Sequence, residues 1–345
     1  MILFRADGNP QVGSGHIMRC LSLADAFRDM GQAVIFATAD NSFQDIIRKR
    51  GYECVVLHTQ YDAMEDELSV LIPLLQKLHP SCILLDSYFV TPGYMAAVRN
   101  ETPLVYIDDQ NAFDYPADLV VNYMLYGGKL NYPQNKQYLL GPKYALLRKE
   151  FQNVPRHQLQ EHVKNVLLST GGADSEHVAL RCAQYLRERP ADGITYHVVL
   201  GAMNQDVAEI EGLTDGCAHI VLHRNVPDMR SLMLQCDAAI SAGGTTLFEL
   251  CACGVPTVTY VLADNQIMNA ASFEEAGLML NAGDIRENDR FAEVIFGQLE
   301  VLTQDWALRK RMAERMQALV DGNGAVWLAK AIQDLLGSDC LTLYR

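Results

Sequence analysis

The chain has 345 residues, which is too long for one ordinary hydrophobic core and suits two domains of about 150 residues each. It contains no run of roughly eighteen apolar residues that would predict a membrane span, and its early charges, Arg5 and Asp7, argue against a signal peptide. The formal net charge of −14, without any basic run, argues against a nucleic-acid partner. Nine scattered cysteines without paired spacing indicate buried thiols in a reducing cytoplasm, so we expect a cytoplasmic protein without a metal site.

Short apolar segments alternate with longer amphipathic segments through the first 150 residues. Strands that are buried on both faces of a parallel sheet are almost wholly apolar, so the short segments predict such strands. The expected strands are residues 2–5, 33–37, 54–57, 82–85, 104–107, 119–122 and 138–140. The expected helices are residues 17–30, 43–50, 65–78 and 93–100. This order predicts a doubly wound, Rossmann-like domain over residues 1–150.

A polar segment that contains Pro155 interrupts this rhythm, and we expect a linker over residues 151–164. The rhythm then restarts, which predicts a second Rossmann-like domain over residues 165–345. Its expected strands are residues 166–169, 195–200, 219–222, 238–241, 257–261 and 279–282. Its expected helices are residues 176–187, 229–235, 245–253, 267–276, 290–304 and 325–336. The fold class is therefore α/β, with two Rossmann-like domains and a ligand cleft expected between them.

The first glycine loop, Gly13-Ser14-Gly15-His16, lies between the first strand and the first helix. Its glycines let the backbone approach a ligand closely, and the helix N-terminus offers unpaired N–H groups. Because the positive end of the helix dipole disfavours an imidazolium, we expect a neutral His16 that can act as a general base. The alternative is a histidine that only caps the loop or packs against the sheet. The loop lacks the third glycine of a dinucleotide fingerprint and the GK[ST] of a P-loop.

The second glycine loop, residues 169–174, contains Gly171 and Gly172. It either contacts a phosphate or sugar, or forms only a tight turn before a helix. Asp174 or Ser175 is a candidate N-cap for that helix.

The third loop carries Gly243, Gly244 and Thr245 at the start of a helix, an arrangement that suits a diphosphate. Glu249 lies one turn into this helix. Its carboxylate is placed to accept hydrogen bonds from two ribose hydroxyls, or else only to offset the helix dipole. Gly254, before Val255 and Pro256, ends the helix.

Longer motifs join these loops into a pattern. They are FRAD-x5-G-x-GH-x-x-R from Phe4, Leu85-Asp86-Ser87-Tyr88, Ile107-Asp108-Asp109, Asn122, Gly141-Pro142-x-Tyr144-x-x-Leu147-Arg148, SAGGTTLFEL from Ser241 with CGVP after it, and Asp264-Asn265-Gln266. This pattern resembles the MurG-like branch of the glycosyltransferase-B superfamily. More closely, it resembles the PseG family of UDP-sugar hydrolases of pseudaminic acid biosynthesis. The resemblance runs through most of the chain, whereas the GGTT segment alone marks only the superfamily.

The resemblance implies the glycosyltransferase-B fold, with UDP held mainly by the C-terminal domain. It implies metal-independent cleavage of the anomeric C–O bond of UDP-2,4-diacetamido-2,4,6-trideoxy-β-L-altropyranose, with no cofactor. It assigns catalytic roles to His16, Tyr88 and Asn265. Without the resemblance, the alternative interpretation is that Tyr88 is only a half-buried residue at the rim of the sheet and that Asn265 only shapes a turn. It also matches Glu249 to the ribose-binding glutamate of the superfamily. The substrate-binding residues that we expect are Gly13, Gly15, Arg19, Gly171, Gly172, Gly243, Gly244, Thr245, Glu249 and Gln266.

Other interpretations remain open from the sequence. The GGTT segment replaces the serine-rich version of some relatives, which favours a glycosyltransferase that needs an acceptor. A UDP-sugar epimerase would need its own acidic residues, which the sequence does not identify, and the joint presence of His16 and Glu249 argues against an inactive binding module. Asp108 and Asp109 form either an acid pair or a turn, and Arg5 either faces the cleft or pairs structurally. Neither the particular UDP-sugar nor the oligomeric state follows from the sequence.

Overall fold

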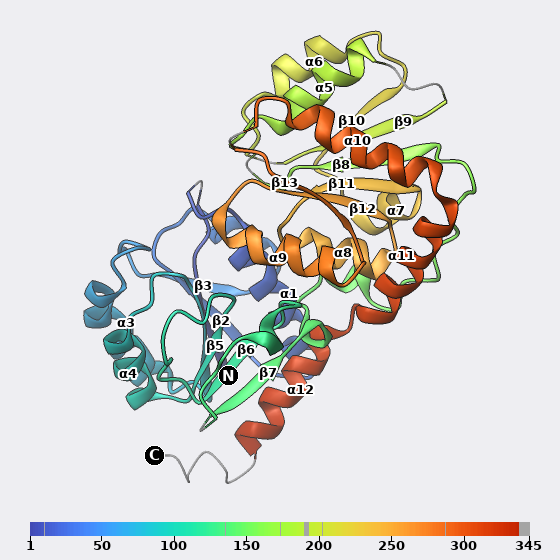
Figure 1. Ribbon diagram of the computed structural model, residues 1–345. Helices are drawn as coiled ribbons and strands as arrows, with labels where there is room; N and C mark the ends of the chain where they lie inside the picture. Colours follow the sequence, from blue (N-terminus) through green and yellow to red (C-terminus); the bar gives the residue numbers. More distant parts are fainter. Residues whose placement is uncertain are drawn as a thin grey trace. The chain divides into compact units, whose positions relative to one another are not determined.

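The computed structural model describes residues 1–337 except residues 10, 135, 173, 190–192, 202 and 287. Its contacts divide the chain into two compact units (Figure 1). Unit 1 comprises Met1–Lys149 together with the last helix, and unit 2 comprises Glu150–Gly322. Each unit is built on a parallel sheet flanked by helices, so the expected pair of Rossmann-like domains is confirmed.

The described part of unit 1 contains a seven-stranded parallel sheet in the order β3-β2-β1-β4-β5-β6-β7. Its strands are β1 (Ile2–Ala6), β2 (Val34–Thr38), β3 (Glu53–Val56), β4 (Cys82–Asp86), β5 (Leu104–Ile107), β6 (Leu119–Asn122) and β7 (Gln137–Leu140). Every residue of β1, β4, β5 and β6 is buried, because helices cover both faces of the sheet. The strand order reverses between β1 and β4, and in such sheets ligands bind next to the ends of the strands at this position.

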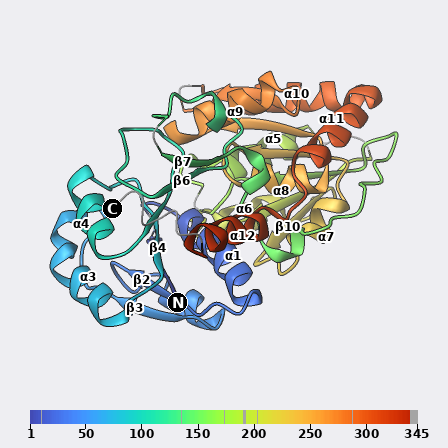
Figure 2. The same ribbon diagram turned by 90° about the horizontal axis from the view of Figure 1, so that it is seen from below.

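The helices of unit 1 are α1 (Gly15–Asp29), α2 (Gln44–Lys49), α3 (Met64–Leu78), α4 (Pro92–Glu101) and α12 (Gly324–Gly337). Helices α3 and α4 pack together on one face of the sheet, whereas α1 and α12 pack together on the other (Figure 2). The start of α4 follows from local sequence. Thr91 accepts a hydrogen bond from the Tyr94 N–H, and Pro92 occupies the first turn.

The described part of unit 2 contains a six-stranded parallel sheet in the order β10-β9-β8-β11-β12-β13. Its strands are β8 (Asn165–Ser169), β9 (Thr195–Leu200), β10 (Ile220–Arg224), β11 (Ala238–Ala242), β12 (Thr257–Val261) and β13 (Leu280–Asp284). Its helices are α5 (Val178–Glu188), α6 (Val207–Thr214), α7 (Met229–Leu234), α8 (Thr246–Cys253), α9 (Asp264–Glu275), α10 (Phe291–Gln304) and α11 (Trp306–Leu319). The predicted helix end at Gly254 is confirmed, because Gly254 closes α8 in the left-handed conformation at φ +65°.

Three helices differ from the sequence expectations. Helices α6 and α11 were not predicted, since α6 has only eight residues and includes Gly212, and α11 is strongly charged. The last helix, α12, was expected in the C-terminal domain, but its contacts assign it to unit 1 because its apolar face packs on α1. Residues 338–345, which close the expected C-terminal domain, lie outside the described residues. Residues 154–164 of the expected linker contain neither helix nor strand.

None of the helices in the described ranges combines the length and the apolar character that a bilayer-crossing segment needs.

Candidate active site

The candidate site of unit 1 lies where three neighbouring strands end. Strand β4 lies between β1 and β5, and Ala6 of β1 is in register with Asp86, the last residue of β4. Helix α1 begins shortly after β1, which brings its first-turn residue His16 to the end of β4. Asp109 follows β5 in the same way. Because parallel strands end at the same edge of a sheet, side chains that are far apart in the sequence meet here.

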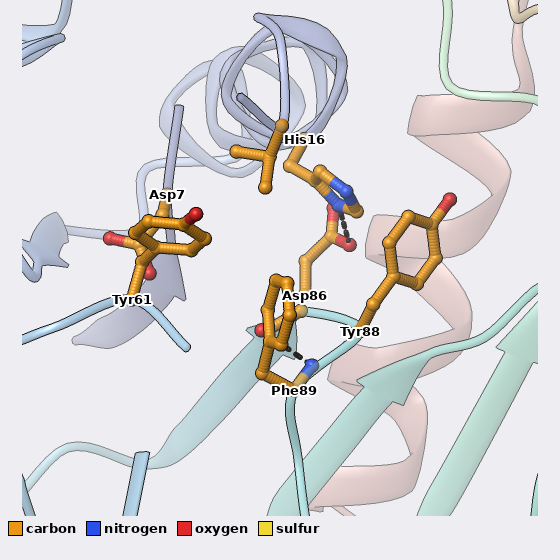
Figure 3. A pocket seen from close by; sticks show the side chains of 8 residues that line it. Asp7, His16, Tyr61, Asp86, Tyr88 and Phe89 are labelled. Carbon is orange, nitrogen blue, oxygen red and sulfur yellow. Dashed lines mark hydrogen bonds and ion pairs between the residues drawn. The ribbon is translucent and has the colours of Figure 1, made fainter. Parts of the chain in front are cut away.

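His16 and Asp86 form a buried hydrogen-bonded pair (Figure 3). The Nδ1 atom of His16 lies 2.6 Å from Oδ1 of Asp86, and Asp86 is 1 % exposed. An ionised carboxylate can only accept hydrogen bonds, so Nδ1 carries the hydrogen and Nε2 keeps its lone pair. Among the described residues, Nε2 has no hydrogen-bond partner, and Figure 3 shows it turned away from Asp86. The pair therefore has the orientation of a carboxylate-supported general base.

Arg19 binds the same carboxylate from one turn further along α1. Its Nε donates to Oδ2 of Asp86 at 2.6 Å, and its Nη1 donates to the Tyr123 hydroxyl at 3.2 Å. Burial alone would raise the pKa of Asp86, but the charge of Arg19, helped by His16, outweighs burial and holds this pKa well below its usual range. Asp86 is therefore ionised at neutral pH. Arg19 was predicted to bind substrate, but its guanidinium is buried and occupied by protein groups, which is the arrangement of a positioning residue.

Tyr88 and Asp109 form a second pair beside the first. The Tyr88 hydroxyl donates to Oδ2 of Asp109 at 2.7 Å, and the Tyr88 ring meets the His16 ring edge-on, with centroids 4.7 Å apart. Nη1 of Arg19 lies 3.5 Å from the same Asp109 oxygen, so one guanidinium lies between the two carboxylates. Burial raises the pKa of Asp109, although Arg19 and Tyr88 oppose this effect. Oδ1 of Asp109 is buried without a hydrogen-bond partner among the described residues.

A pocket opens in front of these pairs. Its lining residues are Asp7, Val12, His16, Tyr61, Asp86, Ser87, Tyr88 and Phe89 (Figure 3). The rings of Tyr61 and Phe89 contact each other edge-to-face, with ring centroids 5.3 Å apart, and Phe89 is 37 % exposed. Such an aromatic pair adds an apolar wall to a pocket that also contains polar groups, as small-molecule sites commonly do.

The loop before His16 is shaped by Asn9. The Asn9 side chain accepts hydrogen bonds from the N–H groups of Gln11 and Val12, and its backbone pairs with Gly13. Gly13 has φ +76°, which favours glycine, whereas a Cβ at exposed Gly15 would meet nothing within 4 Å. The loop therefore leaves the start of α1 open next to the pocket.

The third glycine loop of unit 2 is held by α9. The Gly243 N–H donates to the Tyr260 carbonyl at 2.8 Å, and the Asn269 amide donates to the Gly243 carbonyl at 2.8 Å. A Cβ at Gly243 would lie 3.2 Å from Cβ of Gln266, so glycine permits this close approach. Thr245 precedes α8 without a side-chain capping bond. The predicted residues Gly243, Gly244 and Gln266 are thus neighbours.

The remaining predicted residues of unit 2 lie on the same elements. Glu249 is partly exposed in the first turn of α8, and Asn265 is exposed in the first turn of α9. Gln266 accepts a hydrogen bond from the Leu262 N–H at 3.1 Å, which ties its side chain to the end of β12.

The loop with Gly171 and Gly172 is next to this region in the sheet, because Ser169 of β8 pairs with Ser241 of β11. A Cβ at Gly201 would lie 2.3 Å from the carbonyl oxygens of both loop glycines, so Gly201 permits their close packing. Asp174, one of the two predicted N-caps, accepts hydrogen bonds from the N–H groups of Val178 and Ala179 at 2.9 Å each. The N-cap position of α5 is His177, so the prediction of Asp174 or Ser175 at that position is wrong, although the Asp174 carboxylate does bind the first two N–H groups of the helix.

Some interpretations that the sequence left open are decided by contacts. Arg5 is fully buried and donates two hydrogen bonds to Glu67, so its structural alternative holds. Asp108 accepts hydrogen bonds from the N–H groups of Gln110 and Asn111 and therefore shapes a turn. Sequence reasoning assigned Asp86 no role of its own. The signal that would have found it is an acidic residue at the end of an apolar strand.

Comparisons with known proteins agree with this architecture. Residues 151–319 match the glycosyltransferase family 28 C-terminal domain. The structure of MurG from Acinetobacter baumannii superposes with a TM-score of 0.71 at 15 % identity, covering 96 % of this chain and 99 % of that one. The structure of MnaA from S. aureus with UDP superposes with a TM-score of 0.66 at 12 % identity, covering 97 % of this chain and 96 % of that one.

Curated relatives match this chain at 23–27 % sequence identity. An uncharacterized protein of Methanocaldococcus jannaschii is 27 % identical over 76 % of this chain, and the match spans 55 % of that protein. The spore coat polysaccharide biosynthesis protein SpsG of Bacillus subtilis is 23 % identical over 96 % of this chain and 97 % of its own length. The UDP-2,4-diacetamido-2,4,6-trideoxy-beta-L-altropyranose hydrolase of Campylobacter jejuni is 24 % identical over 54 % of this chain and 65 % of its own length. The chain thus has the glycosyltransferase-B fold, and its residues 151–319 match the C-terminal domain of glycosyltransferase family 28.

Proposed function

We propose that this chain is a UDP-sugar hydrolase that removes UDP from a UDP-activated diacetamido-trideoxyhexose, without a metal. The observation that carries the proposal is the His16–Asp86 pair, whose 2.6 Å hydrogen bond directs Nε2 away from the carboxylate at the edge of a pocket. The similarity to the Campylobacter jejuni hydrolase supports the substrate class. A base that activates water is what hydrolysis requires.

The proposed reaction is a direct displacement at the anomeric carbon. Nε2 of His16 takes a proton from water while the water oxygen bonds to the anomeric carbon. The bond between that carbon and the phosphate oxygen breaks, and UDP leaves with the electron pair. Asp86 stabilises the imidazolium that forms, and it remains ionised because Arg19 neutralises it. The proton then passes from His16 to solvent.

The C-terminal unit would hold the nucleotide. The backbone N–H groups at the start of α8, next to Gly243 and Gly244, suit the charge that gathers on the leaving diphosphate. Glu249 would accept hydrogen bonds from the ribose hydroxyls. Asn265, exposed on the first turn of α9, and the neighbouring Gln266, whose side chain binds the end of β12, would contact the substrate from the same helix.

The test is UDP release from a panel of UDP-sugars without any acceptor, comparing His16→Asn with a matched control. His79→Asn makes the same substitution in the same unit, at an exposed left-handed residue that ends α3 and tolerates asparagine. We expect His16→Asn to lose at least about a hundredfold in turnover, as loss of a general base does, and to keep its affinity for UDP. Near-normal turnover in His16→Asn would contradict the assignment.

Isotope labelling tests which bond breaks. In ¹⁸O-water, the proposed reaction places the label on the sugar and leaves UDP unlabelled. Label in the phosphate of UDP would show attack at phosphorus and would refute the displacement at carbon.

A glycosyltransferase activity is the second candidate. The match of residues 151–319 to glycosyltransferase family 28 and the GGTT sequence of the third loop favour it. It predicts that UDP release depends on an added acceptor, so the same panel separates the two activities.

A further inference from the structure

The pocket of unit 1 contains an apolar wall that the proposed displacement does not use. Phe89 is 37 % exposed, and its ring contacts the ring of Tyr61, with centroids 5.3 Å apart. Val12, from the loop before His16, lines the same pocket. Figure 3 shows Tyr61 and Phe89 at this pocket together with His16. A small apolar group of a bound sugar would be removed from water by contact with this wall.

A hydrogen-bond donor accompanies the wall. The Oγ atom of Ser87, a residue that is 6 % exposed, accepts a hydrogen bond from the Phe89 N–H at 3.2 Å. The hydroxyl also has a hydrogen of its own to donate, and no acceptor for it is found in the described part of the chain. The Tyr106 hydroxyl donates to the Ser87 carbonyl at 3.0 Å, which holds the backbone of Ser87 in place. Ser87 lines the pocket and therefore offers its hydrogen to a ligand there.

A hydrogen-bond acceptor lines the pocket as well. The carboxylate of Asp7 accepts hydrogen bonds from the Ala39 N–H at 2.7 Å and from Nη1 of Arg5 at 2.5 Å. A carboxylate has about four acceptor sites, so these two bonds leave capacity for a ligand. Arg5 is fully buried, and a rotation of Asp7 away from it would remove one partner of a buried charge. The acceptor is therefore held in a fixed place.

We propose that Asp7, Ser87 and Phe89 bind an acetamido group of the activated sugar and thereby determine which UDP-sugars the chain accepts. An acetamido group has an N–H that donates to Asp7, a carbonyl oxygen that accepts from Ser87, and a methyl group that contacts Phe89. A hydroxyl group has no methyl group for the wall, and the methyl group of a 6-deoxy sugar leaves the donor and the acceptor unsatisfied, which is costly. The inference rests on the proposed function for the placement of the sugar in this pocket, and it deepens that function by naming the residues that select the substrate.

The test measures binding instead of turnover, so it does not depend on the reaction that the chain catalyses. The ligands are analogues of UDP-2,4-diacetamido-2,4,6-trideoxy-β-L-altropyranose in which a CH₂ group replaces the oxygen between the anomeric carbon and phosphorus, so UDP cannot leave. One series carries an acetamido, formamido, O-acetyl or hydroxyl group at C2, and a second series carries the same groups at C4. Titration calorimetry of the full chain gives Kd separately from the number of sites, so an unfolded fraction of a variant does not alter Kd.

The position that the pocket holds, C2 or C4, is the one that shows the following preferences. The formamido ligand should bind about fourfold more weakly than the acetamido ligand, the size expected for one buried methyl group, and Phe89→Ala should abolish this difference. The O-acetyl ligand lacks the N–H and should bind about fivefold more weakly than the acetamido ligand, the size expected for one hydrogen bond. Ser87→Ala should reduce the preference for formamido over hydroxyl by about fivefold and leave the fourfold effect of the methyl group unchanged.

Two matched controls make the same substitutions in unit 1. Phe113→Ala removes a partly exposed ring that contacts Tyr115, outside the residues that line the pocket. Ser22→Ala removes a buried hydroxyl on α1 that donates to a backbone carbonyl of the same helix. Both controls should keep every ligand preference of the unmodified chain.

Equal affinities for the acetamido and formamido ligands at both C2 and C4 would overturn the proposal. A methyl effect that survives in Phe89→Ala, or that is lost equally in Phe113→Ala, would overturn the role of Phe89. An unchanged formamido preference in Ser87→Ala would overturn the role of Ser87, and equal binding of the O-acetyl and acetamido ligands would overturn that of Asp7. If Phe89→Ala instead changes the preference for methyl over hydroxymethyl at C6, the wall binds C6 and the proposal is refuted.

The proposed function fails by a different result. A chain that prefers the acetamido ligands but releases no UDP from any UDP-sugar without an acceptor has the acetamido site and is not a hydrolase. A chain that releases UDP but shows no acetamido preference is a hydrolase whose selectivity lies elsewhere.

Discussion

Replacing Asp86 by asparagine removes the charge that contacts both His16, the proposed base, and the neighbouring cation Arg19. Asp86 is 1 % exposed and accepts hydrogen bonds from Nδ1 of His16 and from the guanidinium of Arg19. Asparagine keeps the size and shape of the side chain but removes its charge. Its amide can also donate to Nδ1 of His16, which moves the imidazole hydrogen to Nε2 and removes the lone pair that accepts the proton of water.

The magnitudes follow from these contacts. A buried ion pair that loses one partner destabilises a protein by about 3–5 kcal/mol. We expect the lower end, because Asp109 remains 3.5 Å from Arg19 and partly compensates its charge. For turnover, amidation of a carboxylate that orients a catalytic histidine costs roughly 10³-fold to 10⁴-fold. Turnover should therefore fall far more than stability alone explains.

Asp25→Asn is the matched control. Asp25 lies on α1, is 5 % exposed, and accepts hydrogen bonds from Arg28, Arg50 and Tyr52 away from the pocket. Its two arginines are partly exposed, so we expect a stability loss of about 1–3 kcal/mol, with turnover reduced by no more than about twofold.

Stability is measured by urea unfolding in a Trp306→Phe background. The chain has two tryptophans, and this change leaves Trp327, on α12 of unit 1, as the reporter. Turnover is measured as UDP release from the most active UDP-sugar. If Asp86→Asn loses no more turnover than Asp25→Asn, Asp86 does not orient the base.

Three further predictions concern pH, a glycine and a buried arginine. Folding lowers the pKa of Asp86, so the ionised side chain stabilises the protein above the unfolded-state pKa near 3.9, and this stabilisation is lost as the pH falls below it. The urea midpoint of Asp86→Asn should therefore fall less steeply below about pH 4 than the midpoint of the unmodified chain. Gly201→Ala should displace the loop between β8 and α5 and weaken UDP binding, measured by calorimetry, by about tenfold. The control Gly212→Ala, in open space on α6, should leave UDP binding unchanged and stabilise unit 2 by about 0.5–1 kcal/mol. Equal UDP affinities of the two variants would argue against a role of the β8–α5 loop in binding. The fully buried Arg309 guanidinium donates hydrogen bonds to the carbonyl groups of Leu302, Thr303 and Glu161, so Arg309→Met should destabilise unit 2 by about 2–4 kcal/mol. Urea unfolding monitored by Trp306 fluorescence measures this loss, and an unchanged midpoint would refute it.

Some parts of the site are encoded locally. The glycine loops were found in the sequence because each follows an apolar strand and precedes a helix, and both neighbours are recognisable within about fifteen residues. His16 was found for the same reason, since its position at a helix start is a property of adjacent residues. The bonds from the Asp174 carboxylate to the first N–H groups of α5 are equally local, although the N-cap position itself is His177.

Other parts depend on strand order, which periodicity does not contain. Asp86 and Asp109 reach His16 and Tyr88 only because β4 lies between β1 and β5. His16 and Asp86, for example, are 70 residues apart in the sequence. Arg19 lies on the same helix as His16, yet whether its guanidinium faces substrate or Asp86 depends on what the sheet places beneath it.

The sequence by itself therefore determined the alternation of buried strands and helices, the two Rossmann-like domains and the loops where a ligand would bind, because burial patterns and glycine positions are local signals. Only the tertiary structure decided that Asp86 is the partner of His16, that Asp109 takes the hydrogen of Tyr88, and that α12 returns to pack on α1. These outcomes depend on which strands and helices become neighbours, and that choice is made by the packing of the whole chain rather than by any one segment.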